Sequence, residues 1–149
     1  VYAEQVAAAI ASLGSAIDAD AAEAIWSDAI ATAWDAPPVW VHGDLAATNL
    51  LGDGGRLVGV IDFGQLGVGD PACDLVLAWT GLDASGRRVL RDEVGLDEDT
   101  WRRARGWALW KALITLAGPD SSQRAVQARA LAAVLADPVL DRDVPPIQG

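Results

Sequence analysis

The sequence contains no methionine and only one cysteine, one histidine and one lysine among its 149 residues. A lone Cys73 excludes an intrachain disulfide framework, and Cys73 with a lone His42 cannot form any of the usual structural zinc sites. Lys111 interrupts the best apolar stretch, residues 107–116, so no run reaches the roughly 18 residues that a transmembrane helix needs. The N-terminus lacks the basic and apolar segments of a signal peptide. We therefore expect a soluble, cytoplasmic protein with no membrane partner.

Basic residues are also scarce, with 11 against 21 acidic residues and a net charge of −10. A dedicated nucleic-acid-binding domain carries a basic face, so no nucleic-acid partner is expected. The net negative charge is concentrated in residues 1–86, where Arg56 is the single basic residue. This acidic half would attract a divalent metal or a cationic ligand, but a solvated acidic surface that aids solubility explains the same pattern.

Hydrophobic residues make up 52% of the chain, which is enough to form the core of one domain. Apolar residues at helical spacing predict a first helix over residues 2–13 that ends near Gly14. A second helix is predicted to begin after Asp18 or Asp20, to run on to Ala33, and to be stopped by the prolines at 37–38.

The second half of the chain also predicts helices. One short helix is expected around residues 85–94, and another over residues 121–136 with Ser121 or Ser122 as its cap. Between them, a helix is expected from residues 97–99 to Ala117. It is apolar nearly all round over residues 107–116, which is typical of a buried central helix. Its tryptophans are expected in the core, and its three arginines in solvated first turns. The residues concerned are Trp107, Trp110, Arg102, Arg103 and Arg105.

The residues in the middle of the chain are of the types that favour strands and turns. Residues 39–41 form a β-branched and aromatic run, and two further short runs flank the turn signal Asp53-Gly54-Gly55. We therefore expect a strand at 39–41 and a β-hairpin over residues 48–61. Asp70 followed by Pro71 predicts the start of another helix, with Asp70 as its N-cap.

The polar residues with unusual placement fall in residues 42–74. Asp44 and Asn49 follow the first strand, and Asp62 ends the hairpin, so a reversal of the chain can bring these three side chains to one pocket. Carboxylate and amide oxygens are hard ligands that suit Mg²⁺ bound to phosphate. Taken singly, each aspartate has an ordinary alternative as a turn or cap residue.

Together, these residues resemble the catalytic segment of the aminoglycoside phosphotransferase and choline kinase-like family, relatives of the protein kinases. The kinase pattern is His-Arg-Asp, an Asn five positions after the Asp, and then Asp-Phe-Gly. Here the chain reads His42-Gly43-Asp44, then Asn49, then Asp62-Phe63-Gly64. A Gly69-Asp70-Pro71 segment with Asp74 four residues after Asp70 also resembles the family.

The resemblance implies a mainly α (α+β) fold, namely the C-terminal lobe of a protein-kinase-like enzyme with a small β-hairpin that carries the catalytic and metal-binding loops. This lobe would span residues 1–137, with its catalytic segment at 39–74, and residues 138–149 would form an extended tail. We expect the N-terminal nucleotide lobe of such enzymes to be absent from this chain. Nothing before Pro37 predicts its five-stranded sheet, and Lys111 lies too late in the chain to be its strand lysine. With no methionine and a valine at position 1, this suggests a fragment.

The resemblance also implies roles for individual residues. Asp44 would be the catalytic base, and Asn49 and Asp62 would bind Mg²⁺ and, through it, ATP. Four further residues would support the site structurally: His42, Phe63, Gly64 and Asp74. Cys73 is expected in the core.

The implied activity is Mg-ATP-dependent transfer of a phosphoryl group to a hydroxyl of a small molecule, such as an amino alcohol or an aminoglycoside-like antibiotic. A cationic acceptor would fit the acidic half, with Asp97, Glu98 and Asp99 as acceptor contacts. The isolated chain is expected to be inactive, to bind ATP weakly, and to expose a lobe interface that can drive self-association. The alternative is a non-catalytic, kinase-like binding module for a cationic small molecule or a partner protein.

Overall fold

The computed structural model describes residues 1–119 and 122–137, so the tail expected at 138–149 lies outside the described residues. The fold is mostly helical, with two small antiparallel sheets. Its α-helices are α1 (Tyr2–Leu13), α2 (Ala19–Ile30), α3 (Leu77–Thr80), α4 (Ala84–Val94), α5 (Glu98–Ala117) and α6 (Arg124–Ala136). Its strands are β1 (Val39–Val41), β2 (Leu50–Asp53), β3 (Arg56–Val60) and β4 (Gly67–Gly69). Short 3₁₀ helices are η1 (Gly14–Ala16), η2 (Ala47–Asn49), η3 (Phe63–Gln65) and η4 (Pro71–Val76).

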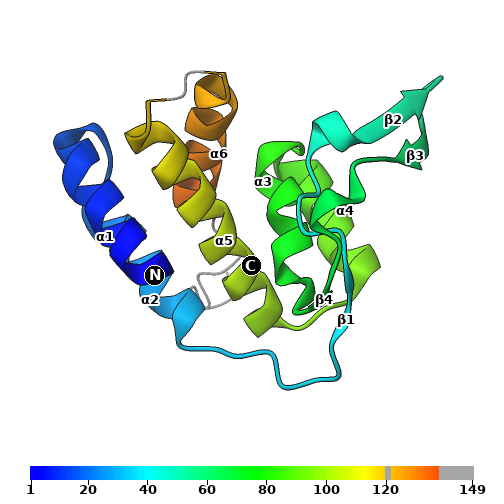
Figure 1. Ribbon diagram of the computed structural model, residues 1–149, viewed down its shortest axis with the longest axis horizontal. Coiled ribbons are helices and arrows are strands. Elements are labelled where there is room, and N and C mark those ends of the chain that lie inside the picture. The colour runs from blue at the N-terminus through cyan, green and yellow to red at the C-terminus, as the bar shows by residue number, and fades with distance from the viewer. Residues whose placement is uncertain (120–121, 138–149) are drawn as a thin grey trace, which may run out of the picture.

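Helix α5 is the centre of the molecule, as its apolar sequence predicts. It packs against α1, α2, α6 and η4, and Figure 1 shows it running between the α1–α2 pair and the part of the chain that carries the strands. Leu109 and Leu113 on this helix are fully buried. Because one helix supports both the N-terminal helices and η4, its side chains set the distance between them.

The helix starts follow the capping predictions more closely than the helix ends. Asp18 caps α2, Asp97 caps α5 and Asp70 caps η4, each by accepting a backbone N–H. The expected end of α2 is wrong: this helix stops at Ile30, well before the prolines, and the Thr32 hydroxyl donates to a carbonyl of its last turn.

The predicted cap of α6 is also wrong for Ser122. The helix begins at Arg124, and its N-cap is Gln123, which makes no side-chain cap hydrogen bond. Gln123 already has helical backbone angles, so the chain enters this helix without the extended residue that a serine cap requires. Ser121 lies outside the described residues.

The predicted hairpin is confirmed over β2 and β3, which pair antiparallel and project from the helical body (Figure 1). Gly54 and Gly55 both have positive φ, as the tight turn between such strands requires. The expected first strand of the hairpin began two residues early, because Thr48 and Asn49 lie in η2. Strand β4 was not expected from the sequence; it pairs antiparallel with β1, with Trp40 opposite Val68.

The expectation that the three arginines of α5 are solvated is wrong for two of them. Arg103 and Arg105 are each only 9% exposed. The Arg103 guanidinium donates to the Asp70 carboxylate over 2.7 Å, and Arg105 donates to the Val134 carbonyl over 2.7 and 2.9 Å. Burial is tolerated because each guanidinium has an oxygen partner supplied by a neighbouring element. Arg102 is 25% exposed and pairs with the surface carboxylates of Asp28 and Asp99.

Trp107 and Trp110 of α5, which were expected in the core, pack against it but remain partly exposed. Within the described residues, no helix combines the length and apolar character needed to cross a membrane.

Candidate active site

The loop after β1 carries the predicted base, and a glycine fixes its path. Gly43 has φ +83°, and a Cβ at this position would lie 2.3 Å from the carbonyl oxygen of Gln65. Gln65 ends η3, the turn that follows Asp62. The backbone around Asp44 therefore packs directly on the segment that carries Asp62, and only a residue without a Cβ fits at position 43.

Asp74 binds the same loop from the other side. Its two carboxylate oxygens accept the backbone N–H groups of His42 at 2.7 Å and Gly43 at 2.8 Å. Asp74 lies in η4, whose start is capped by Asp70, and Arg103 of α5 pairs with that cap. The loop is thus connected to the central helix α5 through Asp74, Asp70 and the buried Arg103.

His42 links the loop that carries Asp44 to the segment that carries Asp62. Its side chain is buried, and its Nε2 lies 2.8 Å from the Ile61 carbonyl oxygen. Its Nδ1 accepts the backbone N–H of Asp44 at 3.3 Å. Both contacts are satisfied by the neutral ring with its proton on Nε2. The ring also packs on Phe63, with centroids 4.8 Å apart, so His42 braces the loop against the hairpin's end.

Asn49 contacts the backbone of Asp44 and of Ile61, the residue just before Asp62. Its side-chain Nδ2 donates to the Asp44 carbonyl over 2.9 Å, and its own carbonyl accepts the Ile61 N–H over 2.9 Å. The side chain is 9% exposed. Because Nδ2 is used in this bond, Oδ1 is the atom left to act as a ligand.

Asp62 has an unusual backbone conformation. At φ 62° and ψ 62° it is the one non-glycine residue with positive φ among the described residues. Asp tolerates this left-handed conformation better than most residues, and such conformations cluster at functional sites. Asp62 is exposed, and a Cβ on Gly64 would lie 3.4 Å from its Oδ1, so the following glycine leaves room around the carboxylate.

The donor set formed by Asn49 and Asp62 fits magnesium better than a transition metal. An amide oxygen and a carboxylate are hard ligands, and Mg²⁺ commonly takes one or two protein oxygens and completes its shell with water and phosphate. In residues 1–119 and 122–137, no cluster of three or more His, Cys, Asp or Glu side chains could hold a metal ion. A Mg²⁺ ion here would therefore depend on phosphate ligands.

Lys111 is a site residue that the sequence did not indicate. Its Nζ lies 2.9 Å from Oδ1 of Asp44, although the two residues are 67 positions apart. Both side chains remain partly exposed, at 36% and 45%. The only signal in the sequence was a single lysine on a helix that is otherwise apolar over residues 107–116.

The acidic residues proposed as acceptor contacts lie elsewhere. Asp97 caps α5, Glu98 pairs with Arg91, and Asp99 pairs with Arg102. With a helical rise of 1.5 Å per residue, Asp97 lies about 20 Å along α5 from Lys111. The Thr100 backbone N–H lowers the pKa of Asp97, as expected for a cap. These carboxylates are therefore engaged and remote from Asp44.

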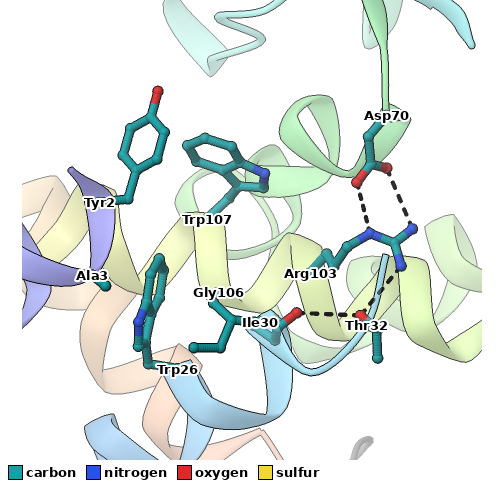
Figure 2. Close-up of a pocket in the computed structure, with 10 residues that line it drawn as sticks. Tyr2, Ala3, Trp26, Ile30, Thr32, Asp70, Arg103, Gly106 and Trp107 are labelled. Carbon is teal, nitrogen blue, oxygen red and sulfur yellow. Dashed lines mark hydrogen bonds and ion pairs between the residues drawn. The ribbon is translucent and has the colours of Figure 1, made fainter. Parts of the chain in front are cut away.

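Two cavities of similar size meet at Tyr2 and Trp107. The first, of about 500 Å³, is lined by Asp44, Lys111 and Trp110. The second, of about 490 Å³, lies against α2 and is lined by aromatic side chains and by the Asp70–Arg103 pair. Figure 2 shows the Arg103 guanidinium facing both carboxylate oxygens of Asp70 at one end of this second cavity.

Cys73 lies beside the first cavity and is half-buried, not fully in the core as expected. Burial, and then the negative charges of Asp74 and Asp70, raise the pKa of its thiol to about 11. The thiol is therefore protonated at neutral pH and is not a nucleophile there.

The chain belongs to the phosphotransferase enzyme family, whose family model matches residues 2–107. It is similar to an aminoglycoside 3'-phosphotransferase of Escherichia coli, with 43% identity over 44 residues, which cover 30% of this chain and 16% of the relative. It is also similar to an aminoglycoside 3'-phosphotransferase of Streptomyces fradiae, with 42% identity over 62 residues, covering 40% and 19%. The matches thus span less than a fifth of each relative. No solved structure matches.

Proposed function

We propose that this chain carries the acceptor and metal-binding part of an enzyme that transfers the γ-phosphoryl group of ATP to a hydroxyl of a small molecule. In this proposal residues 1–137 form the C-terminal lobe of a protein-kinase-like fold, with the catalytic segment at 39–74. The observation that carries it is the junction of two loops. His42 and Asn49 each contact both the backbone of Asp44 and the residue just before Asp62.

Asp44 is proposed as the base. It would orient the acceptor hydroxyl and take its proton as the hydroxyl oxygen bonds to the γ-phosphorus and the bond from that phosphorus to the β,γ-bridging oxygen breaks. Its backbone N–H donates to His42, its carbonyl accepts from Asn49, and Asp74 accepts the N–H groups of the two residues before it. This is the preorganisation that such a positioning role requires. Lys111 holds the carboxylate from the cavity side.

Asn49 and Asp62 are proposed as the residues that hold Mg²⁺ together with the ATP phosphates. When bound, the metal neutralises phosphate charge that the acidic residues of the site would otherwise repel. The Asn49 side chain donates to the backbone carbonyl of Asp44, which orients its Oδ1 relative to the loop that carries the base. His42, Phe63, Gly64 and Asp74 are proposed as structural supports of this arrangement.

The test is phosphoryl transfer from γ-phosphate-labelled ATP to a panel of hydroxylated acceptors, using the complete gene product that contains this sequence. Asp44→Asn should lower kcat by about 10³-fold, because general-base removal typically costs 10²- to 10⁴-fold. Asp35→Asn removes an exposed aspartate outside the site and serves as the control. An Asp44→Asn variant with the control's kcat would refute the role of Asp44. A wild-type protein that binds acceptors but transfers nothing would favour the non-catalytic binding module.

A further inference from the structure

We infer, on the basis of the proposed function, that the acceptor is a hydroxylated compound with a large uncharged apolar or aromatic face, and not a polycation. The cavity beside Asp44 is the one that the acceptor hydroxyl must enter to reach the base. Neither Asn49 nor Asp62 lines this cavity, so an acceptor bound in it does not occupy their side chains. A volume of about 500 Å³ is sufficient for a small organic molecule.

Most of the cavity wall is aromatic or aliphatic, although two uncharged polar residues, Gln65 and Thr115, also line it. Tyr2, Trp107 and Trp110 form a cluster of three rings, each meeting the others edge to face, with centroids 5.1 to 5.5 Å apart. The Trp110 indole donates to the Gln5 side chain over 2.9 Å, which fixes its orientation. Ile114 continues the wall. Rigid aromatic walls of this kind favour an apolar or ring-bearing ligand over a strongly hydrated one.

The charges that line the cavity cancel. Among the described lining residues, Asp44 is the single carboxylate, and it is paired with Lys111. The neighbouring cavity beyond Tyr2 and Trp107 repeats this arrangement. There, the single lining carboxylate belongs to Asp70, and the buried Arg103 guanidinium pairs with it (Figure 2).

Binding of a polycation beside either of these two ion pairs would be unfavourable. Each of its ammonium groups would compete with a resident lysine or arginine for one carboxylate, and like charges brought together across an interface cost several kcal/mol. The net charge of −10 does not offset this, because exposed charges more than about 10 Å away are largely screened at physiological salt. Local pairing therefore decides selectivity, and it disfavours the cationic acceptor expected from the acidic half of the sequence.

Binding calorimetry on the 149-residue chain tests this without requiring turnover. The probes are 4-nitrophenyl β-D-glucopyranoside, an uncharged aromatic glycoside, and kanamycin, a polyamine. At about 150 mM salt the glycoside should bind at least about tenfold more tightly than kanamycin. Tighter binding of kanamycin, or no glycoside binding at millimolar concentration, would overturn the inference.

Two variants locate the glycoside. Tyr2→Ala removes a half-exposed ring of the cavity wall and should weaken glycoside binding by about tenfold. Trp40→Ala removes a ring that is 74% exposed on β1 and lines neither cavity, so it should change binding less than about twofold. Equal effects of the two substitutions would place the glycoside elsewhere. Circular dichroism confirms that each variant remains folded.

Two charge variants distinguish the effect of the Asp44–Lys111 pair from the effect of net charge. Lys111→Gln frees Asp44 and should raise the affinity for kanamycin relative to that for the glycoside by about fivefold. Arg88→Gln makes the same change in net charge on the exposed side of α4 and should leave both affinities unchanged. Kanamycin binding that does not respond to Lys111→Gln would contradict the claim that this pairing excludes polycations. If the binding pattern holds but no phosphoryl transfer is found, the proposed function fails and the ligand class stands.

Discussion

Gly43 and Gln65 are in such close contact that no side chain fits at position 43: a Cβ there would lie 2.3 Å from the Gln65 carbonyl oxygen. Gly43→Ala therefore combines a backbone clash with an unfavourable positive φ. We expect it to lower the free energy of unfolding by about 3 kcal/mol or more. Urea denaturation measures this loss.

Gly95→Ala is the matched control for that substitution. Gly95 ends α4 with φ +63°, and a Cβ at this position would have no atom within 4 Å, so alanine there incurs only the left-handed strain of about 1 kcal/mol. Equal losses for the two glycines would show that the loop around Asp44 is not packed tightly on η3.

Asp74→Asn should loosen the same loop from its other side. The amide keeps the size of the carboxylate but loses its charge, and its NH₂ group cannot accept the second of the two N–H bonds from His42 and Gly43. A loss of about 2 kcal/mol in unfolding free energy is expected, with faster hydrogen exchange at the Gly43 amide. Asp53→Asn, on the exposed hairpin, should change neither. An unprotected Gly43 amide in the unsubstituted chain would contradict this account of Asp74.

Cys73 offers a direct pH test, because no other thiol is present. With its pKa raised from 9.0 to about 11, the native chain at pH 8 holds about a hundredfold less thiolate than the unfolded chain. Alkylation by iodoacetamide, followed by mass spectrometry, should be slower in the native chain by that factor and should accelerate as pH rises toward 11. Equal rates in native and urea-unfolded chains at pH 8 would show that the thiol is not buried as described.

The 149-residue chain alone should bind Mg-ATP only weakly. Its proposed metal ligands are one amide oxygen and one carboxylate, and its single lysine is engaged with Asp44. Mg²⁺ holds its water strongly and needs phosphates that are themselves held in place. Calorimetry should give a dissociation constant above about 1 mM, which corresponds to less than about 4 kcal/mol of binding. Micromolar binding would mean that other residues of this chain hold the nucleotide.

Local patterns in the sequence predicted most of the helices. Apolar residues at helical spacing predicted α1, and the largely apolar stretch of residues 107–116 identified α5 as the central helix. The hairpin was predicted because Gly54 and Gly55 supply the positive φ values that its turn needs. Strand β4 could not be predicted in this way, since its two glycines have no strand preference and it exists only because β1 lies beside it.

Contacts between distant residues explain the errors in the site. Arginine is usually exposed, and only the fold brings Asp70 to Arg103, so burial of this side chain had no local signal. The pairing of Lys111 with Asp44 likewise depends on how α5 packs against η4. The spacing of Asp44, Asn49 and Asp62 did carry information, because these residues belong to two adjoining loops joined by a short hairpin. Their chemical roles remain predictions.

The most direct test of the central claim is turnover by Asp62→Ala at saturating Mg²⁺, in the complete gene product that contains this sequence. Asp53→Ala, which removes an exposed carboxylate at the opposite end of the same hairpin, is the control. If Asp62 holds the metal that orients the phosphates, phosphoryl transfer by Asp62→Ala should fall to background while Asp53→Ala keeps its activity. Turnover by Asp62→Ala equal to that of the control would contradict the assignment of this site.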